Sequence, residues 1–241
     1  MTKVLYEELR PREFEARLTQ APIAYLPLGT LEWHGLHLPL GADGLQSKGL
    51  FCEVARRIGG VVLPMLFLGP DRILHEGDAT YYGMDFCYRP DGKPNRQLPG
   101  SAYHVSDKMY DRILDSVMAQ LARAGFRIVV GHGHGPSNKA FRRNVPVMKE
   151  KYGLTLVSAI FDGAKYGYQS DHAAANETSI LMHLRPELVD MTELPADLNE
   201  TPEAVAGDDP RTHASAEMGL AALNETADYL VDTLTQLLKS L

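Results

Sequence analysis

Short apolar runs alternate along the chain with segments in which apolar residues recur every three or four positions. The run IAYLPL at residues 23–28 is typical of a buried strand, whereas residues 103–124 place Met109, Ile113 and Val117 on one face of a helix. Strands that alternate with helices in this way predict an α/β fold with a mostly parallel sheet.

The same criteria predict the remaining elements. Residues 61–67 are expected to form an edge or bulged strand, because Pro64 has no amide hydrogen to donate. The other expected strands cover residues 127–130 and 154–160, and the other expected helices cover residues 45–58, 139–151, 177–184 and 214–240. The last of these helices is long and amphipathic and closes the chain. No repeat or linker divides residues 1–241, so a single domain is expected.

Residues 71–100 show no periodicity and are rich in Gly, Pro, Asp and Tyr, which predicts a long irregular loop. Loops of this length inside a compact domain are usually functional. The aromatic and arginine content, which includes Tyr81 and Tyr82, suits a lid over a polar substrate and equally suits a subunit interface. Both alternatives stay open.

Charge and cysteine content narrow the possible partners and location. With 24 Lys+Arg against 31 Asp+Glu, the net charge is −7, which argues against binding nucleic acid or an anionic membrane. Cys52 and Cys87 lack metal-type spacing, which is consistent with a reducing compartment. Because no signal peptide and no run of about 18 apolar residues occurs, we expect a cytoplasmic protein with a small-molecule substrate.

Histidine and acidic residues gather in loops that follow predicted strands, where ligands bind in open α/β sheets. The clusters are Glu32, His34, His37 and Asp43; His132 and His134; and Asp171, His172 and Glu177. Side chains two residues apart in extended backbone point the same way, so Glu32 and His34 can face one cavity. Mixed imidazole and carboxylate ligation suits Zn²⁺, Mn²⁺ or Fe²⁺. A hydrogen-bonded network without metal is the alternative.

Several segments resemble motifs of the creatininase (creatinine amidohydrolase) family. They are PLGTLEWHGLHLPLGAD, PGSAYHVS, GHGHGPSN, DHAAANETS and GDDPRTHASAEMG, and they occur in the family's order from about residue 23 to residue 219. The resemblance implies a three-layer sandwich around the parallel sheet, a homo-oligomer that is commonly a hexamer in the family, and two divalent metal ions per subunit.

The resemblance also implies which residues hold the ions. Glu32, Asp43 and His134 would hold one ion, and Asp43 would bridge to a second ion held by His34. Pro136 stands where creatininase has a further glutamate ligand, so we expect Glu177 to replace it, although a solvated acid in the first helical turn is the alternative.

The third cluster provides the candidates for proton transfer. His172 matches a family histidine proposed to transfer a proton, with a structural or substrate-binding role as its alternative. Asp171 would either orient the imidazole of His172 or cap the helix that follows.

Other residues are candidates for substrate contacts or supporting roles. His132, Tyr81, Tyr82 and Trp33 are candidate substrate contacts, with a plain loop position as the alternative for His132. His37 is expected to support the ligands by a hydrogen bond, and Asn138 to cap the helix that follows it. Trp33 is the only tryptophan, so the tryptophans that creatininase places over its substrate have no counterpart. That difference argues against creatinine as the substrate.

Together these features predict a metal-dependent hydrolase of a small cyclic amide or related carbonyl compound, acting on C–N bonds other than peptide bonds. Metal-activated hydroxide would attack the carbonyl, with His172 and Glu177 as the catalytic residues. The alternatives are hydrolysis of a cyclic polyol ketone with C–C cleavage, formamide hydrolysis, and peptide cleavage. A metal-free binding or assembly protein on the same scaffold is the non-enzymatic alternative.

Overall fold

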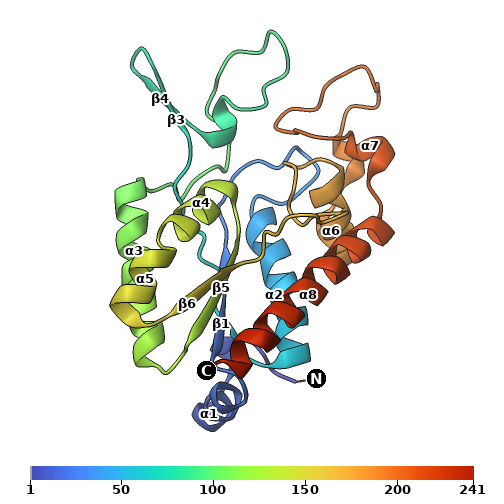
Figure 1. Ribbon diagram of the computed structural model, residues 1–241. Coiled ribbons are helices and arrows are strands. Elements are labelled where there is room, and N and C mark those ends of the chain that lie inside the picture. The colour runs from blue at the N-terminus through green and yellow to red at the C-terminus, as the bar shows by residue number, and fades with distance from the viewer. Residues whose placement is uncertain (1) are drawn as a thin grey trace.

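A four-stranded parallel sheet forms the centre of the computed structural model, which describes residues 2–241 (Figure 1). The strand order is β2-β1-β5-β6, so β1 and β5 are the central strands. The strands are β1 (Ile23–Leu28), β2 (Val61–Val62), β5 (Ile128–Gly133) and β6 (Thr155–Ser158). The α/β fold with a parallel sheet is confirmed.

Helices cover both faces of this sheet and complete three layers (Figure 1). One face packs against α2 (Ala42–Ile58), α6 (Ala175–Leu184) and α8 (Ala216–Lys239). The other face packs against α3 (Asp107–Arg123), α4 (Gly135–Arg143) and α5 (Val145–Tyr152), with α1 (Pro11–Gln20) near the lower end. Short elements complete the chain: η1 (Tyr6–Glu8), β3 (Ile73–Glu76), β4 (Ala79–Tyr82), η2 (Gly83–Asp85), η3 (Pro186–Leu188), η4 (Met191–Glu193) and α7 (Pro210–His213).

The side chains of β1 alternate between the two apolar layers, as the geometry of a strand requires. Tyr25 packs in the layer beneath α2 and α8, whereas Leu26 and Leu28 pack in the layer beneath α3 and α4. All six residues of the strand are buried, which explains why β1 is a continuous apolar run rather than an alternating one.

Helix α8 lies unusually close to α6 because a glycine stands at their crossing. A Cβ atom added at Gly219 would lie only 1.9 Å from the carbonyl oxygen of Ser179. The side chain of Ser179 also accepts a hydrogen bond of 2.9 Å from the amide of Ser215, just before α8. These contacts hold α6, and with it Glu177, against α8.

The helices expected at 103–124 and 45–58 begin at Asp107 and Ala42 instead, the strand expected at 154–160 covers Thr155–Ser158, and four other predicted elements also differ from the structure. The strand expected at 61–67 is regular only at Val61–Val62, because Pro64 interrupts the ladder before a bridge at Leu66 resumes contact with β1. The segment 71–100 is not wholly irregular: β3 and β4 form an antiparallel hairpin. The strand expected at 127–130 continues to Gly133.

The fourth difference is the helix expected at 139–151, which is two helices. Pro146 cannot donate to the carbonyl of residue 142, so α4 ends at Arg143 and α5 begins at Val145, with Pro146 in its first turn. The side chain of Asn144 fills the junction by donating hydrogen bonds to the Asp111 carboxylate and the Ala140 carbonyl.

Candidate metal centre

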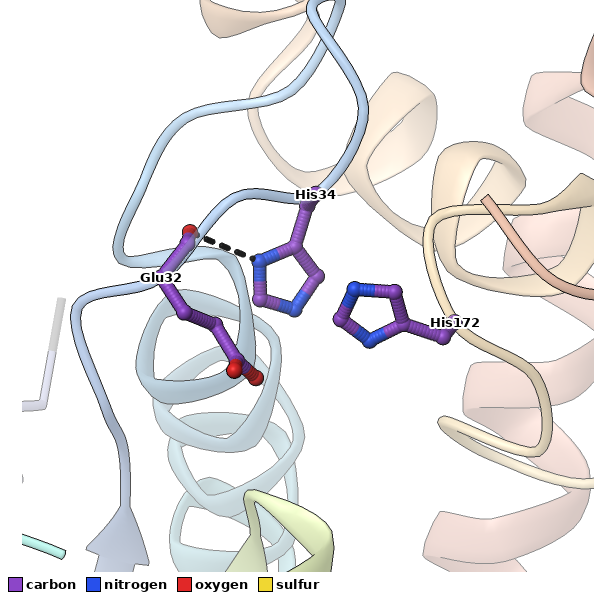
Figure 2. A group of neighbouring side chains, drawn as sticks. All are labelled: Glu32, His34 and His172. Carbon is purple, nitrogen blue, oxygen red and sulfur yellow. Dashed lines mark hydrogen bonds between the residues drawn. The ribbon is translucent and has the colours of Figure 1, made fainter. Parts of the chain in front are cut away.

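The loop between β1 and α2 carries the first three candidate ligands to the carboxyl end of the sheet. The amide of Glu32 donates to the carbonyl of Leu40, which closes this loop and places Asp43 in the first turn of α2. The Nδ1 of His34 donates to the backbone carbonyl of Glu32 at 3.2 Å (Figure 2). In the neutral imidazole Nδ1 therefore carries the hydrogen, and Nε2 has the lone pair that a cation could bind.

His134 reaches the same place from the end of β5. Gly133 precedes it with φ of 141°, and a Cβ at that position would lie 1.7 Å from the carbonyl oxygen of Leu28, so only glycine fits. The Nε2 of His134 donates to the carbonyl of Pro70 at 3.1 Å, which leaves Nδ1 free to accept. That Nδ1 lies 3.1 Å from Glu32 Oε1 and 3.3 Å from Asp43 Oδ2.

Glu177 enters from the first turn of α6. Its Oε2 accepts a hydrogen bond of 2.8 Å from the amide of Ala173 and lies 3.8 Å from Nε2 of His34. The carboxylate of Asp171 accepts from the amides of Asn176 and Glu177 at 2.7 and 3.1 Å. Asp171 therefore caps this helix. Its carboxylate does not orient the imidazole of His172, which was the alternative role.

The five predicted ligands form two groups that share Asp43. Glu32, Asp43 and His134 offer ligand atoms within 4.8 Å of one another, and so do His34, Asp43 and Glu177. All five residues are buried. Within residues 2–241, Glu32 Oε2, His34 Nε2 and Asp43 Oδ2 have no hydrogen-bond partner. Buried polar atoms are rarely left unpaired, so the donor set fits divalent cations of the Zn²⁺, Mn²⁺ or Fe²⁺ type.

Opposing charges perturb the pKa values of this cluster. Burial opposes the charge on His34, but the carboxylates of Asp43, Glu177 and Glu32 outweigh it and raise the pKa to about 10. The pKa of His134 is likewise raised well above its usual value by Glu32 and Asp43, against burial. Burial raises the pKa of Glu177 to about 8, with His34 opposing and the charges of Asp43 and Asp171 adding to the rise.

His172 lies beside the ligand cluster and not within its two bridged groups. Its ring is 4.5 Å from the ring of His34 between centroids, and the two face each other in Figure 2. Its Nε2 donates to the carbonyl of Trp33 at 2.9 Å, which leaves Nδ1 as a proton acceptor. Burial lowers the pKa of His172 to about 4, and the charge of His34 lowers it further. The imidazole is therefore neutral at pH 7.

A cavity of about 620 Å³ opens onto this cluster. Its lining includes four of the five candidate ligands and His172. Arg72, Met84 and Tyr88 from the segment 71–100 also line it, so this segment forms part of the wall. The hairpin and the loop after it rise above the carboxyl ends of the strands (Figure 1).

The four predicted substrate contacts do not line this cavity. His132 is buried in β5, with its ring 5.8 Å from that of Tyr168. The ring of Tyr82 stacks on His104 at 5.2 Å, and Tyr81 lies beside it in the hairpin, paired with Leu74. Trp33 donates its indole hydrogen to the carbonyl of Pro99.

Two supporting residues predicted from the sequence have defined partners. His37 forms a hydrogen bond of 2.9 Å with the hydroxyl of Thr178, next to Glu177 in α6. Asn138 does not cap the helix that follows the second motif, because it lies inside α4 and donates to the carbonyl of Gly133 at 2.6 Å. The residue at the N-cap position is His134.

Two residues of the site went unnoticed as candidates in the sequence. Asp71 has its Oδ2 3.9 Å from Nε2 of His134 and 3.8 Å from Nδ1 of His104. Burial raises its pKa to about 7, and the charge of Glu32 raises it further. Tyr88 lines the cavity with φ of 54°, and its ring lies 5.6 Å from that of His172. The signal for Asp71 is its position after a predicted strand, and the signal for Tyr88 is its place among the aromatic residues of the segment 71–100.

Comparison with known proteins is consistent with this geometry. A family model described as creatininase, creatinine amidohydrolase, matches residues 7–234. The creatinine amidohydrolase of Pseudomonas putida is 23% identical over 210 residues, which cover 78% of this chain and 74% of that protein. The mycofactocin precursor peptide peptidase of Mycolicibacterium smegmatis is 24% identical over 187 residues, which cover 73% of this chain and 63% of the peptidase.

Solved structures agree in fold over nearly the whole length. A crystal structure of creatinine amidohydrolase has a TM-score of 0.75 and 21% identity, with 99% of each chain covered. Two further creatininase structures, with TM-scores of 0.74, are described as a manganese form and as a mutant of Zn–Zn type. In residues 2–241 of the present chain, no helix is long and apolar enough to cross a membrane.

Proposed function

This chain belongs to the creatininase family, and we propose that it is a metal-dependent hydrolase that opens a small cyclic amide or a related carbonyl compound. The observation that carries the proposal is the convergence of three carboxylates and two imidazoles around Asp43, with three of their atoms buried and unpaired. The family relatives named above are hydrolases, which supports hydrolysis as the reaction class.

Glu32, Asp43 and His134 would hold one divalent cation, and His34, Asp43 and Glu177 a second. When bound, such cations polarise a carbonyl and make a water molecule acidic enough to ionise near neutral pH. The hydrogen bonds that Nδ1 of His34 and Nε2 of His134 donate to backbone carbonyls fix the orientation of each ring, so that the opposite nitrogen, which loses its proton when a cation binds, is aimed at Asp43. Glu177 takes the place of the glutamate that Pro136 excludes from the second motif.

His172 would move the proton. Its Nδ1 is free, its ring is neutral, and it borders the cavity beside the ligands. A neutral imidazole with a free nitrogen can accept a proton from the attacking water and pass it to the leaving nitrogen, a role worth typically 10²–10⁴-fold in rate. We further propose that the chain acts as a homo-oligomer, as the family resemblance suggests.

The test combines metal analysis with a substrate screen. The protein is purified under metal-replete conditions and its Zn, Mn and Fe content is measured per chain. It is then assayed on lactams, formamides, cyclic polyol ketones and short peptides. About two equivalents of metal together with lactam turnover support the proposal. Less than about half an equivalent of any of these metals would favour a binding protein on the same scaffold.

If the protein hydrolyses one of the other classes in the screen and not lactams, the proposed metal-dependent hydrolysis stands and the proposed substrate class is wrong. Peptide cleavage is the second candidate, because one of the relatives is a peptide peptidase. Preference for peptides over lactams in the same screen would select it.

A further inference from the structure

Three basic side chains at the mouth of the cavity lack acidic partners. Arg72, Lys139 and Arg142 line the same cavity as the candidate ligands. Within residues 2–241, none of the three forms an ion pair with a carboxylate within 4.0 Å. Arg143 also lines the cavity, but it is 2.8 Å from a carboxylate oxygen of Asp111 and is therefore neutralised.

The placement of these cations follows from helix geometry. Lys139 and Arg142 are three residues apart in α4, so they share one face of this helix. His134 stands at the N-cap position of the same helix, so α4 carries both a candidate ligand and two of the cations. Arg72 comes from a different segment, the one after β2, where it follows Asp71 and has its guanidinium 3.5 Å from the sulfur of Cys87.

Some of the basic side chains also line a second hollow next to the main cavity. A second hollow of about 390 Å³ shares Arg72, Lys139 and Arg143 with the main cavity, together with Gly135 and Pro136 from the start of α4. Its acidic residues are Asp71, which faces His134, and Asp107, which lies 3.5 Å from Arg143. Two of the three unpaired cations, Arg72 and Lys139, thus line this second hollow, and none of the five candidate ligands does.

A solvated helix face is the ordinary explanation of exposed basic residues. It does not explain why basic residues from two separate segments converge on one cavity in a chain whose net charge is −7. A group of unpaired charges of one sign raises the local concentration of ligands of the opposite sign. Guanidinium and ammonium groups bind carboxylates and phosphates through charge-assisted hydrogen bonds.

We propose that the substrate carries an oxyanion, a phosphate or a carboxylate, which Arg72, Lys139 and Arg142 bind while its scissile carbonyl reaches the cluster around Asp43. This inference rests on the proposed hydrolase function for the position of the carbonyl. The anion site itself stands on the three cations and holds whether or not the chemistry is correct.

The binding test uses the full chain in its metal-loaded form with inorganic phosphate and acetate as probes. Dissociation constants are measured by calorimetry at low ionic strength for the parent chain and for Lys139→Gln/Arg142→Gln. The matched control is Arg123→Gln/Lys149→Gln, which removes the same two charges from exposed positions that do not line the cavity. Metal content is measured for each, because phosphate also binds metal ions.

We expect Lys139→Gln/Arg142→Gln to weaken binding about tenfold or more at unchanged metal content, and the control to stay within about twofold. Loss of phosphate binding alone identifies a phosphate site, and loss of acetate binding alone identifies a carboxylate site. If neither probe binds the parent chain, or if both bind the Gln variant as tightly as the parent, the anion site is wrong.

A turnover test separates this inference from the proposed function. The matched substrates are 5-oxoproline and 2-pyrrolidinone, which share a lactam and differ in one carboxylate, and N-formylglycine and its uncharged amide. If the inference holds, the parent chain has a higher kcat/KM for the anionic member of a hydrolysed pair. In Lys139→Gln/Arg142→Gln this preference is lost because the KM of the anionic substrate rises. Equal turnover within a pair contradicts the inference. Absence of turnover on both pairs counts against the proposed function, while the binding test still decides the anion site.

Discussion

The carboxylate of Glu177 lies 3.8 Å from Nε2 of His34, although the two residues belong to different motifs. Helix α6 thereby supplies an acid to the ligand cluster, whereas the second motif has Pro136 and no acid at that position of its sequence. The same carboxylate accepts a hydrogen bond from the amide of Ala173, which fixes its direction. Because Glu177 lies beside His34, we expect His34, Asp43 and Glu177 to form a complete second ligand group, even though the second motif lacks its glutamate.

Glu177→Gln should therefore remove one ion and leave the other. The glutamine retains an acceptor for the Ala173 amide but loses the negative charge that would attract a cation between His34 and Asp43. We expect the metal content to fall from about two equivalents to about one, measured by mass spectrometry of the metal-loaded protein. The control is Glu193→Gln, an exposed acid in η4. Unchanged content in Glu177→Gln would show that Glu177 is not a ligand.

Asp43→Ala should remove both ions and all turnover. Asp43 Oδ2 lies 3.5 Å from His34 Nε2 and 3.3 Å from His134 Nδ1, so it belongs to both groups. The same metal analysis, with Asp232→Ala as an exposed control, decides the point. Full metal content and activity in Asp43→Ala would refute the bridging assignment.

His172→Ala should keep the metal and lose the rate. The ring contacts Trp33 and His34 but stands outside the two groups that share Asp43. We expect kcat on the substrate found by the screen to fall by about 10²–10⁴-fold at unchanged metal content, whereas His213→Ala, at an exposed position, leaves both unchanged. Loss of an ion instead would assign His172 as a metal ligand. Its ring offers a nitrogen within 4.8 Å of ligand atoms of Glu32 and His34.

Metal affinity should rise with pH. In the metal-free protein the pKa of His34 is raised to about 10 and that of Glu177 to about 8, so both groups are protonated at pH 7. A cation must displace these protons, so higher pH favours binding, by about tenfold per pH unit for each proton released. Competition with a zinc chelator at pH 6, 7 and 8 measures this slope. A metal affinity that does not change between pH 6 and pH 8 would show that binding releases no proton from His34 or Glu177.

Creatinine should be a poor substrate. Trp33 is the only tryptophan, and its indole donates to the carbonyl of Pro99 and does not line the cavity. The tyrosine that does line it is Tyr88, whose ring is tilted by 32° against that of His172 at 5.6 Å. We expect little or no creatinine hydrolysis by the metal-loaded protein. Turnover near that of a dedicated creatininase, measured side by side, would contradict this prediction. It would show that Tyr88 can replace the missing tryptophans in binding creatinine.

The sequence by itself determined the parallel α/β architecture, and it named five candidate ligands without showing that they meet. Apolar runs such as residues 23–28 specify buried strands by composition alone, and parallel strands direct the loops after them to one edge. The i, i+2 spacing of Glu32 and His34 allows both side chains to face one cavity, and the resemblance to the creatininase motifs adds His134 as a candidate ligand.

Only the tertiary structure decided the contacts between segments that are distant along the chain. The approach of Glu177 to His34, the capping role of Asp171 and the arrival of Asp71 beside His134 depend on how α6 and the segment after β2 pack. The convergence of Arg72 with Lys139 and Arg142 is of the same kind. Such contacts carry no periodic signal, since they are set by packing between layers and not by the conformation of either segment alone.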